Sequence, residues 1–404
     1  MRMTLASLGA LTLTALLFTA CDKDQVGGTT PPEDLSMTQA DLSGDVADMA
    51  VDTPDLTTPA DLATTPVTPT EFTVVRIGMG TTALTNDATA TFLERRKIAD
   101  GSLVGAALAL PTTAGIGANK QLTLSGLASV EGQLTRSTDG KYLIIAGYAA
   151  AVGSPNVSSS SSATVNRVIG RIDAAGNINT TTASTGFTAA GMRGAASTDG
   201  NMLWVSSDSG IGYTTLGSTA VPTLLNITNV RGIGIFGSGN GVQLYASSVS
   251  NPNQGLNAVG TGTPTAANTT VTRLAGFTAA NSPASVGFVA FDRDGNGTVD
   301  QMYVADDTLG AGGGIQRWKL NSGNSWMQEG IVSTGANAGA RYVTGWVTGT
   351  TATLLVTTAE GGGVNPRILQ LTDNGGATSA VTTKMLATAA GNTTYRGIAL
   401  APNP

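Results

Sequence analysis

Residues 136–140 read Arg-Ser-Thr-Asp-Gly, and residues 141–145 continue with Lys-Tyr-Leu-Ile-Ile. The same arrangement returns at 196–205 as Ala-Ser-Thr-Asp-Gly followed by Asn-Met-Leu-Trp-Val. An Asp-Gly pair between two apolar segments is a strong hairpin signal, because Gly readily adopts the backbone angles that a tight turn needs. The two stretches therefore predict a strand–turn–strand unit that is repeated along the chain.

The repeat extends over residues 71–404, where short strand candidates alternate with turn residues and no helical period is sustained. Its first strand recurs with an Arg near the start, and units begin near residues 131, 192, 230, 285, 340 and 395. The last three intervals are close to 55 residues, which is within the range of four-stranded β-propeller blades with their loops, whereas the earlier intervals are uneven. We expect six blades. Seven is the alternative, because the long interval after residue 131 has room for another, and a β-solenoid would have shorter, more regular rungs.

The last unit contains a single strand candidate, Tyr395–Ala401. The start of the domain supplies three more: Phe72–Ile77, Thr91–Ile98 and Leu103–Leu110. A blade built from both ends of the domain closes the ring and removes both exposed sheet edges. We therefore predict an all-β propeller whose closing blade has one C-terminal strand and three N-terminal strands.

Four strings within 72–404 carry a family resemblance: Arg76-Ile-Gly-Met-Gly80, Phe92-Leu-Glu94, Leu110-Pro111, and Tyr303-Val-Ala-Asp-Asp307 with Gly313-Gly-Ile-Gln-Arg-Trp318. Through them the domain resembles a group of exported bacterial propeller proteins of unassigned activity. The strings indicate a fold family and not a reaction, so the resemblance implies no catalytic residue.

The N-terminal segment has the layout of a bacterial lipoprotein signal. Arg2 gives a positive start, residues 5–18 are mostly apolar, and Phe18-Thr-Ala-Cys21 is similar to a lipobox. Cys21 is the only cysteine of the chain. We expect residues 1–20 to be a signal peptide and Cys21 to carry lipid that anchors the exported protein in the cell envelope, at the inner or outer membrane. The alternative is an ordinary secretory signal cut near Ala20.

Residues 21–70 are predicted to be a disordered tether that follows the lipidated cysteine. Positions 22–70 contain no aromatic residue and ten carboxylates against Lys23 alone, and such a segment buries too little apolar surface to fold. Without the tether and Arg2, the chain's 21 basic and 27 acidic residues reduce to 19 and 17. A domain so close to neutral does not indicate a nucleic-acid-binding face, so we expect no nucleic-acid partner.

The chain contains no His, which excludes Ser-His-Asp and Cys-His catalysis and His-ligated zinc. Two suitably spaced carboxylates cleave glycosidic bonds without His. The candidates for that role are Glu131, Asp306, Asp307 and Glu360. The four tryptophans could stack on sugars, but at strand positions we expect them to form blade core: Trp204, Trp318, Trp326 and Trp346.

Residues 292–300 read Asp-Arg-Asp-Gly-Asn-Gly-Thr-Val-Asp. Oxygen-bearing side chains at the first, third, fifth and ninth places, with a backbone carbonyl at the seventh, have the spacing of a calcium loop. The predicted ligands are Asp292, Asp294, Asn296, Thr298 and Asp300. Between two predicted strands, the segment resembles the calcium hairpins of integrin-type propellers. We expect a structural Ca²⁺ here, and a metal-free hairpin turn is the alternative.

Arginines recur at the start of four predicted innermost strands: Arg193, Arg231, Arg341 and Arg396. Such arginines could form a cationic ring that binds anionic ligands at one mouth of the channel. Alternatively, each Arg pairs with an acid or a carbonyl of a neighbouring blade and ties the ring together.

These observations favour a lipid-anchored envelope propeller that serves as a non-catalytic binding or scaffold module for a surface polysaccharide or protein. One alternative is a carboxylate-based polysaccharide hydrolase or lyase. Another is a purely structural envelope protein. The missing catalytic motifs favour binding over catalysis, and the fold by itself does not decide between them.

Overall fold

The computed structural model describes residues 68–404, except 116–118, 362 and 364. The predicted signal peptide, Cys21 and positions 22–67 of the tether lie outside the described residues. The described part is built of β-strands and three short 3₁₀ helices: η1 (Val157–Ser159), η2 (Gly239–Gly241) and η3 (Thr378–Ala380). It contains no helix that is long and apolar enough to span a membrane.

Most described strands belong to six antiparallel sheets of four strands. From the innermost strand outward, the first three sheets are β6 (Leu134–Arg136), β7 (Tyr142–Tyr148), β8 (Arg167–Asp173), β9 (Ile178–Ser184); β10 (Met192–Ser197), β11 (Met202–Ser207), β12 (Gly210–Thr215), β13 (Thr223–Leu225); and β14 (Val230–Phe236), β15 (Gln243–Ser248), β16 (Gly255–Val259), β17 (Val271–Arg273).

The other three sheets are β18 (Ser285–Phe291), β19 (Gln301–Asp306), β20 (Gly314–Leu320), β21 (Trp326–Val332); β22 (Ala338–Thr348), β23 (Thr351–Glu360), β24 (Arg367–Asp373), β25 (Thr382–Thr388); and β26 (Thr394–Leu400), β1 (Glu71–Ile77), β3 (Thr91–Lys97), β4 (Leu108–Ala109). A small additional sheet pairs β2 (Ala88–Thr89) with β5 (Leu124–Ser125).

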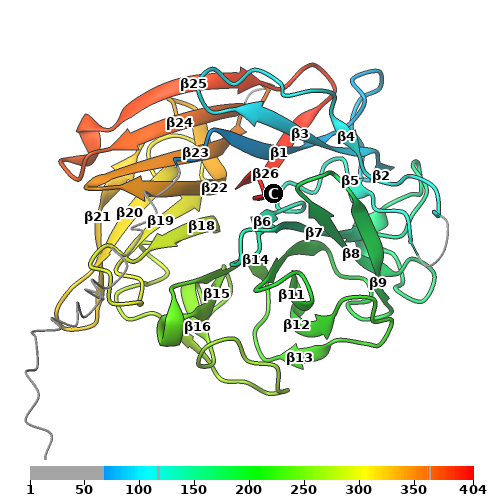
Figure 1. Cartoon of the computed structure of the whole chain (residues 1–404), viewed down its shortest axis with the longest axis horizontal. Helices are drawn as coiled ribbons and strands as arrows, with labels where there is room; N and C mark the ends of the chain where they lie inside the picture. The colour runs from blue at the N-terminus through cyan, green and yellow to red at the C-terminus, as the bar shows by residue number, and fades with distance from the viewer. Residues whose placement is uncertain (1–67, 116–118, 362, 364) are drawn as a thin grey trace, which may run out of the picture. The chain divides into compact units, whose positions relative to one another are not determined.

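The six sheets surround a central axis as the blades of a propeller (Figure 1). Each innermost strand contacts the innermost strands of the two neighbouring blades. The prediction of an all-β, six-bladed propeller is confirmed, and the seven-bladed alternative is wrong. The long interval after residue 131 contains the loop 149–166 between β7 and β8, which includes η1 and no further blade.

The closing blade has the predicted composition of one C-terminal and three N-terminal strands. β26 pairs with β1 through contacts such as Phe72 with Leu400 and Val74 with Ile398, and β1 continues outward to β3 and β4. The outermost strand is shorter than expected, because only Leu108–Ala109 of the predicted Leu103–Leu110 form a strand. Positions between 102 and 107 are mostly exposed, so little burial holds them in a ladder.

The hydrophobic core is divided into six clusters of described residues, one at each interface between neighbouring blades. Trp204, Trp318 and Trp326 are buried in these clusters, which confirms their predicted core role, while Trp346 is half-buried against one of them. Trp318 stacks on Phe277 with ring centroids 3.9 Å apart. Each large side chain buried in this way contributes about 1.5–3 kcal/mol to stability.

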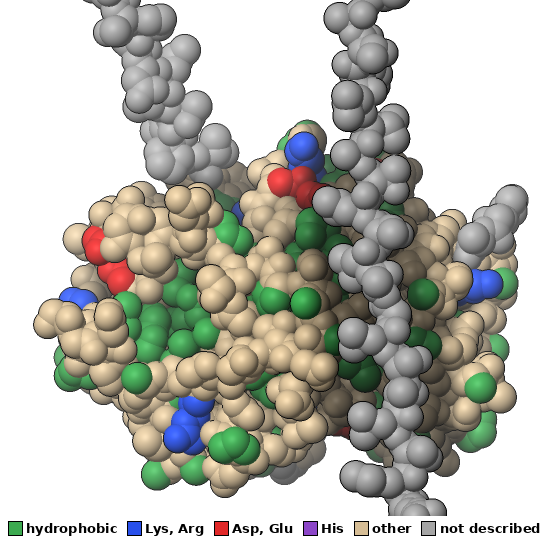
Figure 2. Space-filling view, turned by 90° about the horizontal axis from the view of Figure 1, so that it is seen from below, with side chains coloured by type: hydrophobic (Ala, Val, Ile, Leu, Met, Phe, Trp, Pro, Cys, Tyr) green, Lys and Arg blue, Asp and Glu red, His purple; other side chains and the backbone are tan. Residues whose placement is uncertain are grey.

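Charge is sparse on the outer side of the ring. Only 12% of the residues in the chain are Asp, Glu, Lys or Arg, and on the side seen in Figure 2 they are few and scattered among neutral ones. A cluster of charges inside the channel is therefore a local feature and does not belong to a broadly charged surface.

Closure of the ring generates a prediction at Gly397 of β26. A Cβ at this position would lie 2.1 Å from the Leu134 backbone nitrogen and 2.3 Å from the Gly132 carbonyl oxygen in the next blade. We expect Gly397→Ala to lower the free energy of unfolding by about 1–3 kcal/mol or more, measured by urea unfolding. Gly391→Ala is the matched control, since no atom lies within 4 Å of its Cβ position. Equal stability of the two variants would contradict close packing at this joint.

Candidate functional site

The central channel has two chemically different ends. Since every blade has the same strand order, the six innermost strands run in one direction around the axis. Their first residues meet at one end, which contains the four arginines and is called the arginine end below. Their last residues meet at the other, called the apolar end.

β-Bulges set the positions of the arginines. The ladder between β10 and β11 skips Arg193, and the corresponding ladders of β14 and β22 skip Arg231 and Arg341 in the same way. In the closing blade, the irregularity between β26 and β1 spans Arg396 and Gly397. A bulge leaves its extra residue outside the ladder and redirects its side chain. The recurrent Arg is thus a recurrent bulge residue.

Two arginines have acidic partners. Arg231 Nη1 lies 3.0 Å from Asp307 Oδ1, across the interface between the third and fourth blades. Arg193 Nη2 lies 3.7 Å from Asp208 Oδ2 of its own blade. The side chains of Arg193 and Arg231 are 15% and 22% exposed, so both reach solvent at the mouth. The predicted inter-blade pairing therefore holds for Arg231.

Arg396 is buried (3% exposed) and has no acidic partner among the described residues. Its guanidinium donates hydrogen bonds to the Thr394 hydroxyl at 2.9 Å and to the Gly126 carbonyl at 3.1 Å. Arg341 likewise forms no ion pair within the described ranges. These two arginines carry charge that the surrounding residues compensate poorly.

The guanidinium groups at this end are also incompletely hydrogen-bonded. The Nε atoms of Arg193, Arg341 and Arg396 are buried and have no hydrogen-bond partner among the described residues, a condition that costs about 1–3 kcal/mol per donor. Burial lowers the pKa of Arg341. Burial, together with repulsion from Arg341, lowers the pKa of Arg396 to about 9. The arginine end is therefore an electrostatically strained cluster of cations.

Glu131 lies beside this cluster and is fully buried. Its carboxylate accepts hydrogen bonds from the Tyr148 hydroxyl at 2.5 Å, the Ser158 hydroxyl at 2.7 Å and the Ser125 backbone at 3.1 Å. Burial raises the pKa of Glu131 in spite of these bonds and of the nearby charge on Arg193. Its environment is that of a structural carboxyl group held in the wall of the channel.

Gly191 separates Glu131 from a second carboxylate that the sequence did not single out. A Cβ on Gly191 would lie 3.3 Å from Glu131 Oε1 and 3.4 Å from Asp208 Oδ2. Asp208 follows β11 and is partly exposed. No motif marks it in the sequence, because its position depends on the loop after a second strand and not on the repeated Arg.

The remaining catalytic candidates serve other contacts. Asp306 is buried and accepts hydrogen bonds from Thr308 N at 3.0 Å and Gln316 Nε2 at 3.1 Å. Glu360 accepts a hydrogen bond from Arg367 Nε at 2.7 Å. These two carboxylates are therefore engaged in holding loops and strands together.

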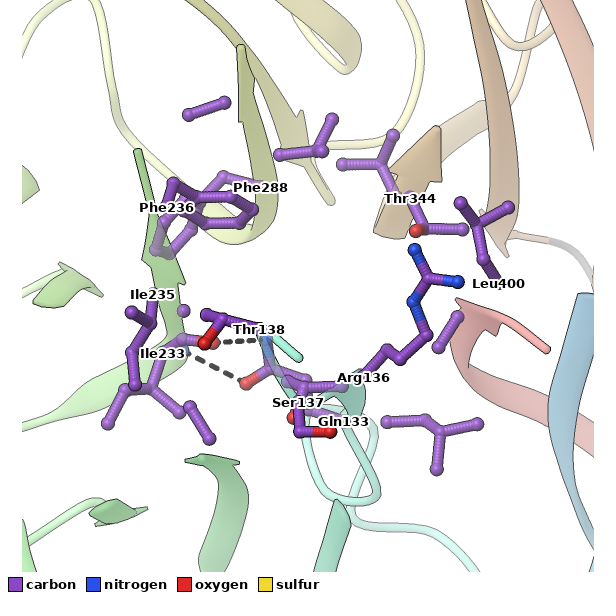
Figure 3. Close-up of a pocket in the computed structure, with 18 of the residues that line it drawn as sticks. Gln133, Arg136, Ser137, Thr138, Ile233, Ile235, Phe236, Phe288, Thr344 and Leu400 are labelled. Carbon is purple, nitrogen blue, oxygen red and sulfur yellow. Dashed lines mark hydrogen bonds between the residues drawn. The ribbon is translucent and has the colours of Figure 1, made fainter. Parts of the chain in front are cut away.

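The apolar end contains a cavity of about 270 Å³ that residues of all six innermost strands line. Ile235 and Phe236 lie on one side of it, and Arg136 extends across the opposite side (Figure 3). Arg136 is the only charged residue among the described lining residues. The sequence interpretation placed Arg136 in a hairpin and gave no sign that its side chain faces the channel.

The predicted calcium segment forms the loop between β18 and β19. Asp292 accepts hydrogen bonds from Gly295 N at 2.8 Å and Gly297 N at 2.7 Å. Although desolvation raises the pKa of Asp292, these two bonds together with hydrogen bonding from Asp294 and Asn296 outweigh it, so the net pKa is lowered. Within the described ranges, no three or more Asp, Glu, Cys or His side chains form a group that could hold a metal. Calcium binding here stays a prediction.

The fold and its channel define the chain as a six-bladed β-propeller protein. No known family model matches the sequence, and no curated protein matches it.

Solved structures with a distant similarity to this chain include the periplasmic gluconolactonase of Pseudomonas aeruginosa, with 12% identity, 82% of this chain and 100% of that chain covered, and a TM-score of 0.43. A putative TolB from Agrobacterium tumefaciens has 12% identity, coverage of 83% and 99%, and a TM-score of 0.36. A quinoprotein alcohol dehydrogenase-like protein from Bacteroides thetaiotaomicron has 11% identity, coverage of 83% and 92%, and a TM-score of 0.36. Such distant likenesses say nothing about the activity of this chain.

The raised pKa of Glu131 predicts a pH effect. A carboxyl group whose pKa is raised by folding stabilises the fold below its ordinary pKa of 4.5, and this stabilisation is lost as the pH rises through the raised value. We expect the wild type to lose about 1 kcal/mol or more relative to Glu131→Gln as the pH is raised from 4.5, measured by urea unfolding. If the stability of the wild type and of Glu131→Gln changed with pH in the same way, the raised pKa of Glu131 would be contradicted.

The calcium hypothesis has its own test. If the loop binds Ca²⁺, the melting temperature of the wild type rises with added calcium, and Asp292→Ala combined with Asp294→Ala abolishes the rise, because two oxygen ligands are lost. Asp139→Ala, in another Asp-Gly turn whose Asp accepts a backbone hydrogen bond, is the control that keeps the rise. If added calcium did not change the melting temperature of the wild type, the calcium site would be ruled out.

Proposed function

We propose that the chain is an exported, lipid-anchored propeller that binds an anionic group of a surface polysaccharide or protein at the arginine end, without catalysing a reaction. The lipid anchor rests on the sequence around Cys21. The observation that carries the binding role is the convergence of Arg193, Arg231, Arg341 and Arg396 at one mouth, where Arg341 and Arg396 form no ion pair with any described residue.

An anion supplies what this cluster lacks. A carboxylate accepts two parallel N–H bonds from one guanidinium, and such charge-assisted pairs are stronger than neutral hydrogen bonds. Burial is the main cause of the lowered pKa of Arg396, and repulsion from Arg341 adds to it; negative charge bound near Arg341 offsets that repulsion. A ligand with repeated acidic groups, such as a polyuronate or an acidic protein segment, fits these requirements.

A hydrolase is the second candidate, because Glu131 and Asp208 flank Gly191. One carboxyl group with a raised pKa beside an exposed carboxylate is the arrangement that glycoside hydrolysis requires. The full burial of Glu131 and its three hydrogen bonds disfavour this role, since a general acid must reach the leaving oxygen.

Binding is tested with a Cys21→Ser chain, which cannot be lipidated, titrated against polygalacturonate. We expect saturable, salt-sensitive binding that Arg341→Gln weakens at least about tenfold, or about 1.4 kcal/mol. The same substitution should leave the melting temperature unchanged or raise it, because it removes a poorly compensated charge. A purely structural arginine would instead lose stability when replaced.

Arg273→Gln, on the outermost strand of the third blade, is the control for loss of one positive charge. The proposal fails if the wild type does not bind or if Arg341→Gln binds as tightly as this control. Release of reducing ends from the polymer by the wild type, and its loss in Asp208→Asn, would favour the hydrolase instead.

A further inference from the structure

The cavity at the apolar end has the composition of a small ligand site that is separate from the arginine end. It takes residues from every blade and has a volume of about 270 Å³, slightly below the range of about 300–1,000 Å³ for drug-sized ligands. Its apolar side is formed by Phe236 and Ile235, while Ile233 and Phe288 are buried in the cores between neighbouring blades (Figure 3). The rings of Phe236 and Phe288 pack against each other at 5.7 Å, so this side is preformed.

Most polar side chains around the cavity are already engaged. Gln133 exchanges two hydrogen bonds with the Ile233 backbone, at 2.8 and 3.0 Å, as the dashed lines in Figure 3 show. Thr135 and Thr138 donate to carbonyls of the second blade at 2.7 and 3.0 Å. A sugar, which needs many polar partners, would find few of them here.

Arg136 is the exception. Its guanidinium extends over the cavity toward Thr344 (Figure 3) and makes one hydrogen bond with the described residues, to the Ala401 carbonyl at 3.2 Å. No carboxylate occurs among the described lining residues, and burial lowers the pKa of Arg136. A desolvated guanidinium with free donors, facing an apolar wall, is matched by a ligand that has one carboxylate and an apolar body.

We propose that the apolar end of the channel binds a small amphipathic monocarboxylate, with its carboxylate on Arg136 and its alkyl or aryl body against Ile235 and Phe236. The residues that line this cavity do not include any of the four arginines at the other end, so the two sites use different side chains. Binding of an acidic polymer at one end neither requires nor excludes this ligand at the other.

The test is calorimetric titration of the Cys21→Ser chain with octanoate. We expect saturable binding that Arg136→Gln weakens at least about tenfold. Octanol, which has the same chain without the charge, should bind the wild type and Arg136→Gln equally. Octyltrimethylammonium should bind neither, because its charge has the wrong sign. Arg273→Gln, on an outermost strand, and Arg341→Gln, which does not line the cavity, should retain wild-type affinity for octanoate.

A second variant tests whether the ligand binds in this cavity. Thr344 is partly exposed and lines the cavity, so Thr344→Phe fills space without replacing a core residue and should abolish binding of octanoate and octanol together. The proposal is overturned if octanoate does not bind the wild type, or if Arg136→Gln binds it as tightly as Arg273→Gln does. It is also overturned if Arg341→Gln weakens octanoate binding as much as Arg136→Gln, which would assign the carboxylate to the arginine end.

Discussion

The antiparallel pairing of β1 with β26 is the contact on which the rest of the ring depends. It joins positions such as Phe72 and Leu400, which lie near opposite ends of the described chain. Without it, the closing blade would lose its innermost strand and two of the six inter-blade clusters would lose one wall. Because each blade buries its apolar faces only against its neighbours, closure lets every blade complete its core.

Closure also determines the chemistry of the channel. Because the six innermost strands run in one direction, their first residues lie together at one end of the channel and their last residues lie together at the other end. The bulges at the starts redirect four arginines, whereas the regular ends of the innermost strands contribute mostly uncharged residues, with Arg136 as the one charge among the described lining residues. One repeated strand therefore generates a charged end and an apolar end.

The sequence was sufficient for the repeat, the closing blade and the recurrence of the arginines, because these depend on local turn chemistry and on periodicity. It was insufficient for the bulges, since Arg193 in a bulge and Arg193 in a regular strand have the same local pattern. The roles of Asp208 and Arg136 were missed for a related reason. The positions of both residues depend on how the blades pack, and no short motif indicates that packing. The length of β4 was also mispredicted, because it depends on burial.

The place of β1 in the closing blade has a mechanical consequence. A pull applied to the chain before Glu71 enters the ring along β1, which has hydrogen-bonded ladders to β26 on one side and to β3 on the other. Force along a strand flanked in this way loads both ladders in shear, so many hydrogen bonds share it at once. A terminal strand at the outer edge of a blade would have a ladder on one side only, so fewer hydrogen bonds would share the same load.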